Sequence, residues 1–413
     1  MPTIMTTTTT CASGDLAQRL TELRALRNDA LTEDDLLKVE ERLREVLANL
    51  SKLDAQSTTW NNAGIFLATL LLQKGEESST KEAGVLLAER GFAYRLSVKS
   101  LMHNHATPSD PPNRYSASWD GILPDPLLTR LDAAFGPSSE FWDRHDYSDG
   151  SGGKDPSPYF SYIVPINNGA STSQSTALHD IIRRIQCQIS DVFPDVNECK
   201  YCEWWAHCRP HSSGHQLHFD SDDEGRGGVR NPVCSTVVNL SADVGMGGET
   251  LVTTQTSSGR SLATKGWLCA NKRNRLLAFR GDLLHGVVPG PRVASRATDD
   301  GKSEREARER RRITFMVAFW KDICIQDKEG HGSARPFSRV ADEGWARPLS
   351  ESVGEENNAQ DHNVSKAKES FFQVPVWEDV DVEQNKTNGL SVKEIRKYKL
   401  ALPPYEDFFQ FYS

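Results

Sequence analysis

A histidine and an aspartate, His218 and Asp220, stand two positions apart in the segment QLHFDSD. Side chains of a β-strand alternate between its two faces, so these two share one face while Leu217 and Phe219 point to the other. A further histidine, His285, ends the apolar run LLAFRGDLLHGV. Two imidazoles and one carboxylate on one side of an ion are the ligand set of non-haem Fe(II) sites, which leave adjacent positions open. We therefore expect these three residues to bind a metal that also takes a chelating co-substrate and O₂.

An arginine is the candidate anchor for an acidic co-substrate. Arg312 leads into the apolar run ITFMVAFW, and strand alternation places Arg312, Thr314 and Met316 on one face. A guanidinium pairs bidentately with a carboxylate, so Arg312 and Thr314 are expected to hold the far carboxylate of a 2-oxo acid. Arg312 is favoured because it leads directly into the strand and has a threonine two residues on. The competing anchors are Arg292, Arg296, Arg310 and Arg311.

The order of these motifs resembles that of the iron(II)/2-oxoglutarate-dependent dioxygenases, in particular their prolyl-4-hydroxylase-like branch. The similar segments are GHQLHFDSD, VGMGGETLV (with Gly247 to Thr250), RLLAFRGDLLHGVVPG and RRITFMVAFW, all between residues 200 and 320. Two departures stand out. The branch often has lysine where this chain has Arg312, and the 27 positions from His285 to Arg312 (312 − 285) exceed the usual spacing. A charged insertion at 295–311 accounts for the excess.

The resemblance implies a double-stranded β-helix (jelly-roll) fold. It also implies iron ligands at His218, Asp220 and His285, and a 2-oxoglutarate contact at Arg312. The implied reaction couples oxidative decarboxylation of 2-oxoglutarate to hydroxylation of a C–H bond, with release of succinate and CO₂. The implied cofactors are Fe(2+), 2-oxoglutarate as co-substrate and O₂, with ascorbate as an accessory reductant.

The elements that position these residues follow from the patterning of the 413-residue chain. Leucines at helical spacing predict helices before residue 105, including 60–73 and 81–97, and a further helix over 176–192. Thr32 and Asp35 resemble a capping box. Residues 103–118 read as a linker, whereas short apolar runs separated by Gly, Pro and Asn from 200 to 320 predict an all-β sandwich or barrel.

The predicted fold class is therefore α+β, with a jelly-roll core, a helical N-terminal region and a C-terminal extension. The expected divisions are a disordered segment 1–14, a helical region 15–105, a dioxygenase domain 119–325 and an extension 326–413. Within the dioxygenase domain, the β core spans about 200–320 and the loop insertion 295–311.

A structural zinc site is the competing metal hypothesis. Its candidate ligands are Cys199, Cys202, His207, Cys208, His211 and His215. Cys-x₂-Cys spacings favour such sites. However, no second Cys-x₂-Cys follows, and strand alternation in CEWWAHC puts Cys202 and Cys208 on the face opposite His207. Buried thiols are the simpler interpretation.

Composition bounds the partners. With 48 Lys+Arg against 57 Asp+Glu, the net charge of −9 disfavours nucleic-acid binding driven by charge. The acidic run Asp222, Asp223 and Glu224 is either a solvated turn or a recognition site for a basic substrate. The apolar run 63–72 is about half the roughly 20 residues of a membrane span, and the start of the chain lacks the features of a secretory signal. We therefore expect an intracellular protein, cytoplasmic or nuclear, with no membrane contact.

Three classes of function remain open at this point. The first is hydroxylation of a protein side chain, such as prolyl or lysyl. The second is oxidation of a small-molecule substrate, or nucleic-acid demethylation. The third is a non-catalytic binding protein on the same fold. The sequence leaves the substrate and the oligomeric state undetermined.

Overall fold

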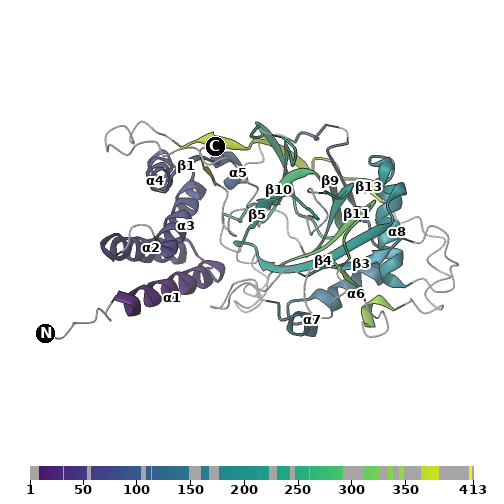
Figure 1. Ribbon diagram of the computed structural model, residues 1–413, viewed down its shortest axis with the longest axis horizontal. Coiled ribbons are helices and arrows are strands. Elements are labelled where there is room, and N and C mark those ends of the chain that lie inside the picture. Colours follow the sequence, from purple (N-terminus) through teal and green to yellow (C-terminus); the bar gives the residue numbers. More distant parts are fainter. Residues whose placement is uncertain are drawn as a thin grey trace.

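In the computed structural model, a helical part and a β part lie side by side (Figure 1). The structure describes residues 9–30, 32–53, 57–103, 108–112, 114–147, 160–166, 176–222, 230–241, 247–259, 261–291, 311–325, 334–337, 344–347, 364–380 and 409–411. Outside these residues lie positions 1–8 of the expected disordered segment 1–14, positions 292–310 with most of the expected insertion 295–311, and most of the chain after 380. No helix among the described residues is long and apolar enough to cross a membrane.

The helical part consists of α1 (Thr9–Asn28), α2 (Glu33–Leu53), α3 (Thr58–Lys74), α4 (Glu77–Ala88) and α5 (Val98–Leu101). Helix α2 forms because Val39, Leu43, Val46 and Leu50 recur at helical spacing and are all buried. The predicted capping box is confirmed: Asp35 N–H donates to the Thr32 hydroxyl, and Thr32 N–H donates to the Asp35 carboxylate.

The β part is built from two facing sheets. The large sheet has the strand order β12-β3-β4-β11-β6-β9-β2-β13, and the small sheet has the order β14-β8-β7-β10-β5. From β4 to β11 the chain passes repeatedly between the two sheets, and its strand pairs are antiparallel. The strands up to β11 are β2 (Ser116–Asp120), β3 (Tyr162–Pro165), β4 (Tyr201–Pro210), β5 (His215–His218), β6 (Cys234–Ser241), β7 (Thr250–Thr256), β8 (Lys265–Cys269), β9 (Arg275–Arg280), β10 (Leu283–Val287) and β11 (Arg311–Trp320).

Helices cover the outer face of the large sheet, as Figure 1 shows for α6 and α8. These helices are α6 (Asp125–Phe135), α7 (Glu140–Arg144) and α8 (Ala177–Ile189), followed by a 3₁₀ turn, Pro194–Glu198. The outward residues of β4 and β11, among them Trp204 and Phe315, belong to the same buried cluster as Leu131 and Ile185 from the helices. The inward residues of β4 and β11 are therefore left to line the space between the sheets.

The outer face of the small sheet is covered by the N-terminal helices. Leu217, Phe219 and Leu284 belong to one buried cluster with residues of α1 to α4 such as Leu43 and Leu71. The predicted outward direction of Leu217 and Phe219 is thus confirmed. The helical region shares its core with the strands that carry His218 and His285, so it supports the back of the candidate site.

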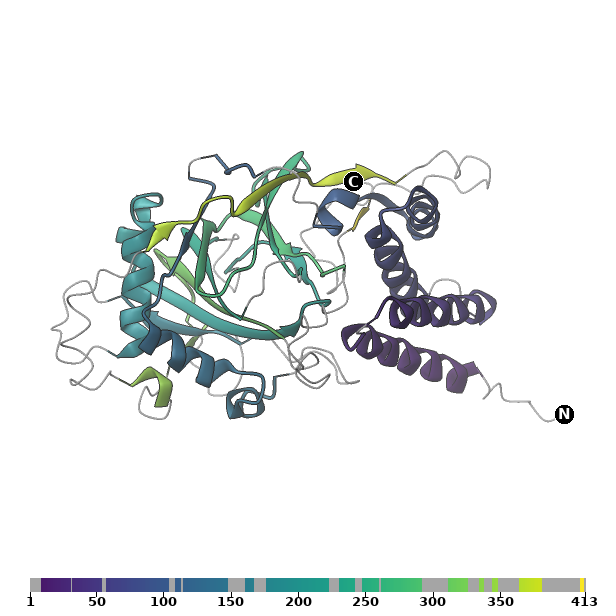
Figure 2. The same cartoon turned by 180° about the vertical axis from the view of Figure 1, so that it is seen from behind.

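The last described segments bind both parts of the molecule together. They form β12 (Arg335–Pro336), a 3₁₀ turn (Gly344–Ala346), β13 (Ser365–Lys366), β14 (Phe371–Pro375), β15 (Trp377–Asp379) and β16 (Phe409–Phe411). Strand β13 pairs with β2, β14 with β8, and β15 with the N-terminal strand β1 (Phe92–Leu96). The reverse view shows this yellow-green segment running from the sheets to the helical part (Figure 2).

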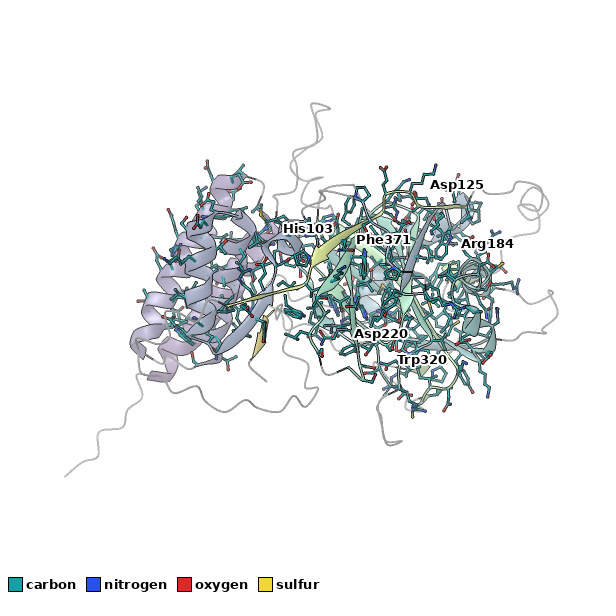
Figure 3. All side chains as sticks on the ribbon, turned by 90° about the horizontal axis from the view of Figure 1, so that it is seen from above. His103, Asp125, Arg184, Asp220, Trp320 and Phe371 are labelled. Carbon is teal, nitrogen blue, oxygen red and sulfur yellow. The ribbon has the colours of Figure 1, made fainter. Side chains whose placement is uncertain are left out.

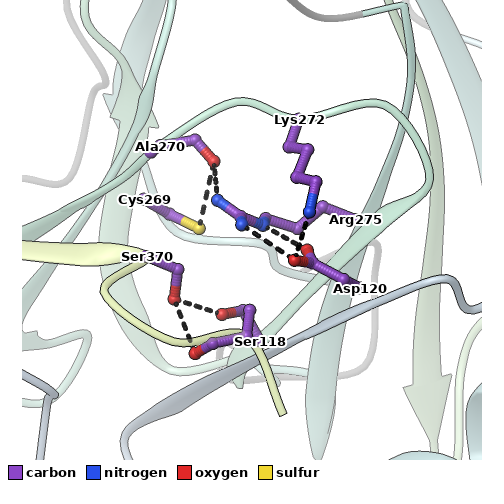
Figure 4. A network of polar contacts seen from close by, with 8 residues as sticks. Ser118, Asp120, Cys269, Ala270, Lys272, Arg275 and Ser370 are labelled. Carbon is purple, nitrogen blue, oxygen red and sulfur yellow. Dashed lines mark hydrogen bonds and ion pairs between the residues drawn. The ribbon is translucent and has the colours of Figure 1, made fainter. Parts of the chain in front are cut away.

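A polar network fixes the start of that segment against the large sheet (Figure 4). Arg275 donates from Nε and Nη2 to the two carboxylate oxygens of Asp120, at 2.7 and 3.2 Å, and Lys272 adds a third contact at 2.7 Å. Beside it, the hydroxyls of Ser118 and Ser370 lie 2.6 Å apart. Strands β2 and β9 and the turn before β14 are therefore joined by side chains as well as by backbone pairing.

Three local expectations were wrong. Residues 92–96, predicted as the end of a helix, form β1, because β15 and β16 pair with both of its edges. Residues 116–118, predicted as the end of the linker 103–118, begin β2, which pairs with β9 over its whole length. Residues 9–14, predicted as disordered, lie in α1. Burial of Leu16, Leu20 and Leu23 fixes that helix, and extending a formed helix costs much less than starting one.

The shared core predicts different costs for two leucines of α2. Leu43 is fully buried, whereas Leu37 is 48% exposed. Leu43→Ala should lower the free energy of unfolding by about 2–5 kcal/mol because it leaves a cavity. The matched control, Leu37→Ala, should stay within about 0.5 kcal/mol of wild type. Urea denaturation followed by circular dichroism measures both, and equal losses would contradict this packing.

Candidate functional site

The structure brings His218, Asp220 and His285 together. His218 on β5 and His285 on β10 are directly opposite partners in the small sheet. Each imidazole Nε2 lies near Asp220 Oδ1, at 3.5 Å for His218 and 3.7 Å for His285. One ligand atom from each residue lies within 4.8 Å of the others, which makes this the one such group of three in the described part of the chain. Figure 3 places Asp220 inside the β part.

Backbone carbonyls orient both imidazoles. His218 Nδ1 lies 2.8 Å from the carbonyl oxygen of Gln216, and His285 Nδ1 lies 3.0 Å from that of Leu283. A carbonyl only accepts, so Nδ1 carries the proton and each Nε2 keeps its lone pair for an ion. The carboxylate is fixed similarly, because the Ser235 hydroxyl donates to Asp220 Oδ2 at 2.6 Å and leaves Oδ1 toward the histidines.

The charge states of His285 and Asp220 suit metal binding. Burial, and then the neighbouring His218, lower the pKa of His285 to about 4, so the ring is neutral at physiological pH. Burial acts to raise the pKa of Asp220, but the two histidines and the Ser235 hydroxyl together hold it well below its ordinary value. A neutral imidazole at His285 and an ionised carboxylate at Asp220 are the protonation states in which these groups ligate a cation. The residues present therefore fit a divalent metal.

A cavity of about 420 Å³ lies between the sheets and includes all three residues. Arg312 and Thr314 line it, as strand alternation predicts, and both are almost fully buried. Arg312 Nε and Nη2 have no hydrogen-bond partner among the described residues. Burial, and then the neighbouring Arg209, lower the pKa of Arg312 to about 10, so it remains charged at neutral pH. A buried cation with orphaned donors fits the carboxylate of a ligand.

The Gly-Gly-Glu-Thr motif builds the wall beside this arginine. Gly247 and Gly248 adopt φ angles of +82° and +73°, which favour glycine. A Cβ on Gly247 would lie 2.4 Å from Gly290 Cα, and one on Gly248 would lie 3.2 Å from Arg312 Cδ. The two glycines thus allow the backbone to approach both the segment after β10 and the arginine stem.

The helical part reaches the same segment after β10. Arg27 and Gln73 each donate to a backbone carbonyl there, to Gly290 and Pro289 respectively, at 2.9 Å in both cases. His103, between the two parts in Figure 3, lies 3.2 Å from the Pro289 carbonyl oxygen. The loop that follows the His285 strand is therefore held from the helical side.

Of the four competing arginines, one lies outside the cavity and three fall outside the described residues. Arg311 donates to the backbone carbonyl of Cys208 at 3.1 Å and is absent from the cavity wall. Arg292, Arg296 and Arg310 fall outside the described residues.

The zinc hypothesis finds no support in the described residues. Cys199, Cys202 and Cys208 are buried as free thiols in the cluster between the large sheet and its helices. His207 and His215 instead line the cavity on the other face of β4. Strand alternation separates the thiols from the imidazoles, and burial raises the pKa of the Cys199 and Cys208 thiols to about 12.

The first residue of the acidic run after the candidate ligands, Asp222, is buried and so does not belong to a solvated turn. Asp222 is 7% exposed, and its carboxylate accepts from Arg230 at 2.6 Å and from the Cys324 backbone N–H at 2.7 Å. Asp223 and Glu224 lie outside the described residues. Asp222 is thus occupied in joining two loops at the cavity.

One cavity residue has unusual chemistry that the sequence did not indicate. Glu203 on β4 is buried, and burial raises the pKa of its carboxyl to about 7, with Asp220 and Asp222 adding to the effect. The alternation in CEWWAHC indicated its face, but no motif marked its role. Two aromatic residues of the cavity wall, Tyr147 and Phe160, were not indicated either, because they come from segments distant in sequence.

Among solved structures, the chain is similar to several enzymes, but no protein-family model and no curated protein matches it. A Pseudomonas putida prolyl-4-hydroxylase matches with 14% identity and a TM-score of 0.28, covering 51% of this chain and 94% of that one. An oxidoreductase of the 2OG-Fe(II) oxygenase family from Burkholderia pseudomallei matches with 14% identity and a TM-score of 0.27, covering 62% and 92%. HygX from Streptomyces hygroscopicus, with nickel and 2-oxoglutarate bound, matches with 10% identity and a TM-score of 0.26, covering 53% and 92%. Because these TM-scores are below 0.5, the matches do not establish the function of this chain, which depends on the chemistry of the site itself.

The raised pKa of Glu203 predicts a pH dependence of stability. The folded-state pKa of about 7 exceeds the ordinary value of 4.5, so the stabilisation is complete below about pH 4.5 and is lost as the pH rises to about 7. Glu203→Gln cannot titrate and should flatten this fall in melting temperature. The control Glu198→Gln, at an exposed position outside the cavity, should keep the wild-type slope. Thermal denaturation of the metal-free chain from pH 4 to 8 measures it, and an unchanged slope in Glu203→Gln would refute the assignment.

Proposed function

We propose that this chain is an Fe(II)/2-oxoglutarate-dependent oxygenase that hydroxylates a C–H bond of its substrate. The observation that carries the proposal is the His218–His285 cross-strand pair with Asp220 Oδ1 beside both Nε2 atoms. Three ligands on one side of an ion form the facial arrangement of non-haem iron sites. Iron bound there supplies O₂ activation coupled to decarboxylation of 2-oxoglutarate, which yields succinate and CO₂.

The strand order supports the proposal. The chain alternates between the two sheets so that β4, β11, β6 and β9 are neighbours in one, and β8, β7, β10 and β5 in the other. This alternation is what a double-stranded β-helix, in which two sheets enclose a site between them, would produce, and it therefore supports that fold assignment.

Arg312 and Thr314 would hold the distal carboxylate of 2-oxoglutarate. Arg312 offers two buried donors without partners among the described residues, and Thr314 adds a hydroxyl on the same strand face. Pairing a guanidinium with a carboxylate away from water is strong and directional, so it would orient the co-substrate toward the three ligands.

The remaining wall residues orient the substrate and exclude water. Phe160, Trp205 and Met316 line the cavity with apolar surface. Its volume of about 420 Å³ lies within the usual range for sites that enclose a small molecule or one side chain. We propose a protein side chain as the target, such as a prolyl or lysyl side chain, because the helical part and the long C-terminal segment add surface around a small cavity. Oxidation of a small metabolite, nucleic-acid demethylation and non-catalytic binding on this fold are the alternatives.

Turnover without added substrate tests the assignment of the metal ligands. With Fe(II), 2-oxoglutarate and O₂, wild type should form succinate, and His218→Ala should form none because a ligand is lost. His179→Ala on α8, outside the cavity, is the matched control and should retain the wild-type rate. Succinate formation is measured by mass spectrometry, and binding of a divalent metal by calorimetry. Activity that survives in His218→Ala would rule out this iron site.

The carboxylate anchor has its own test. Arg312→Ala should raise the 2-oxoglutarate concentration for half-maximal rate roughly 100-fold, the value of one or two hydrogen bonds to a charged group. The neighbouring Arg311→Ala should leave it unchanged, because Arg311 donates to a backbone carbonyl outside the cavity. The dependence of the succinate rate on 2-oxoglutarate measures both. If Arg311→Ala or Arg296→Ala causes the increase instead, Arg312 is not the anchor.

A further inference from the structure

The cavity has ends of opposite charge. Arg209 and Arg312 are direct partners in the β4–β11 pairing and line one end. Glu203 lies on the same inward face of β4, six residues from Arg209, which corresponds to about 20 Å along a strand. The arginine end suits an anionic co-substrate. With that end occupied, the substrate itself would bind toward the other end, where the carboxyl of Glu203 lies.

Glu203 lies level with Ser235, the residue that holds one of the candidate metal ligands. Ala318 of β11 pairs with Glu203 on one side and with Ser235 of β6 on the other, so the three side chains point to the same side of the sheet. Ser235 is the residue whose hydroxyl holds Asp220. The two outer strands are about 10 Å apart, and only the methyl group of Ala318 stands between them. The carboxyl of Glu203 therefore faces the same part of the cavity as Ser235 and the Asp220 that Ser235 holds.

The carboxyl is held in place without an opposite charge. Ser161 donates its hydroxyl to Oε1, and Trp320 Nε1 donates to Oε2 at 3.1 Å. The backbone N–H of Ala334 donates to Ser161 Oγ at 2.7 Å, which orients that hydroxyl. Glu203 is 7% exposed, and within the described residues no lysine or arginine pairs with it. Each oxygen accepts one hydrogen bond here and has a lone pair left for a ligand.

Asp222, the other carboxyl of this end, differs in that Arg230 pairs with it. Because Arg230 already compensates the charge of Asp222, a cationic ligand would add little stabilisation to that carboxylate. A buried carboxyl without a counter-ion is costly, which makes Glu203 the group whose environment a positively charged ligand would improve.

Aromatic rings accompany Glu203. Trp205 lies two residues along on the same face of β4, and Phe160 and Trp320 also line the cavity. The faces of such rings attract cations, and the attraction increases when water is excluded. A carboxyl beside aromatic surface is a suitable receptor for an organic ammonium or guanidinium group.

We propose that Glu203 is a specificity-determining residue, whose carboxyl receives a basic nitrogen of the substrate and places the neighbouring carbon before His218, Asp220 and His285. The role of that carbon rests on the proposed oxygenase function, whereas the binding of the basic group does not. The substrate class is accordingly a molecule or side chain that carries an amine or guanidine.

Three probes of one shape test the preference: benzylamine, benzyl alcohol and benzoate. Each is titrated by calorimetry at pH 8 into the full-length chain, loaded under anaerobic conditions with Fe(II) and 2-oxoglutarate, and again into the metal-free chain. Benzylamine should bind wild type at least 10-fold more tightly than benzyl alcohol in both states. In the chain loaded with 2-oxoglutarate, which would occupy Arg312, benzoate should bind most weakly. Equal binding of amine and alcohol in either state, or a preference for benzoate in the loaded chain, would overturn the inference.

Variants assign the preference to Glu203. Glu203→Gln keeps the shape but not the charge, so the preference for benzylamine over benzyl alcohol should vanish, whereas the control Glu198→Gln should keep it. If Glu203→Gln does not fold, Glu203→Asp provides the test, because its withdrawn carboxyl should weaken benzylamine binding several-fold while benzyl alcohol is unaffected. A preference unchanged in these variants refutes the role. Failure of the oxygenase proposal would appear separately, as absence of Fe(II) binding in a chain that still prefers benzylamine.

Discussion

The site depends on the antiparallel pairing of β5 with β10. This pairing sets His218 opposite His285, and the alternation of side chains along the same strands sends Leu217, Phe219 and Leu284 to the other face. A shift of either strand by one residue would turn a ligand into the helical core and an apolar side chain into the cavity. Burial of the outer face against the N-terminal helices therefore fixes the register on which the ligand geometry depends.

In the large sheet, burial of the outer face likewise fixes which charged side chains point into the cavity. Its outward residues on β4 and β11 are apolar, with Cys202 and Cys208 among them, and pack against α6 to α8, so the inward positions are free to carry Arg312, Thr314 and Glu203. Buried charges of opposite sign would lower each other's cost if they were adjacent. Here they stand apart along the strands, so the energetic compensation falls to whatever molecules enter between the sheets.

Much of the site could be predicted from the sequence, because its spacing within each strand is local. Arg312 and Thr314 need only the two-residue period of β11. The same period predicted the pairing of His218 with Asp220, although β5 ends at His218 and Asp220 lies just beyond the strand. Pairing between distant segments has no such local signal. Strand β1 was predicted as helix because its partner strands lie at the other end of the chain. The start of β2 was predicted as linker because β9, the strand with which it pairs, lies far along the sequence. Glu203 illustrates the limit well: its face followed from alternation, but its neighbours Ser161, Trp320 and Ala318 come from elsewhere in the chain.

The pairing of β1 with β15 also has a kinetic consequence. Arg95 of β1 contacts Glu378 of β15 across 283 residues of chain. At synthesis rates of roughly 5–20 residues per second, β1 and the helices beside it wait some tens of seconds for this partner. During that interval the edges of β1 are unpaired, and apolar residues such as Leu96 lack part of their cover. Contacts so distant in sequence also slow folding after synthesis. The nascent chain thus has a long period in which chaperone binding and misassociation compete with completion of the native sheet.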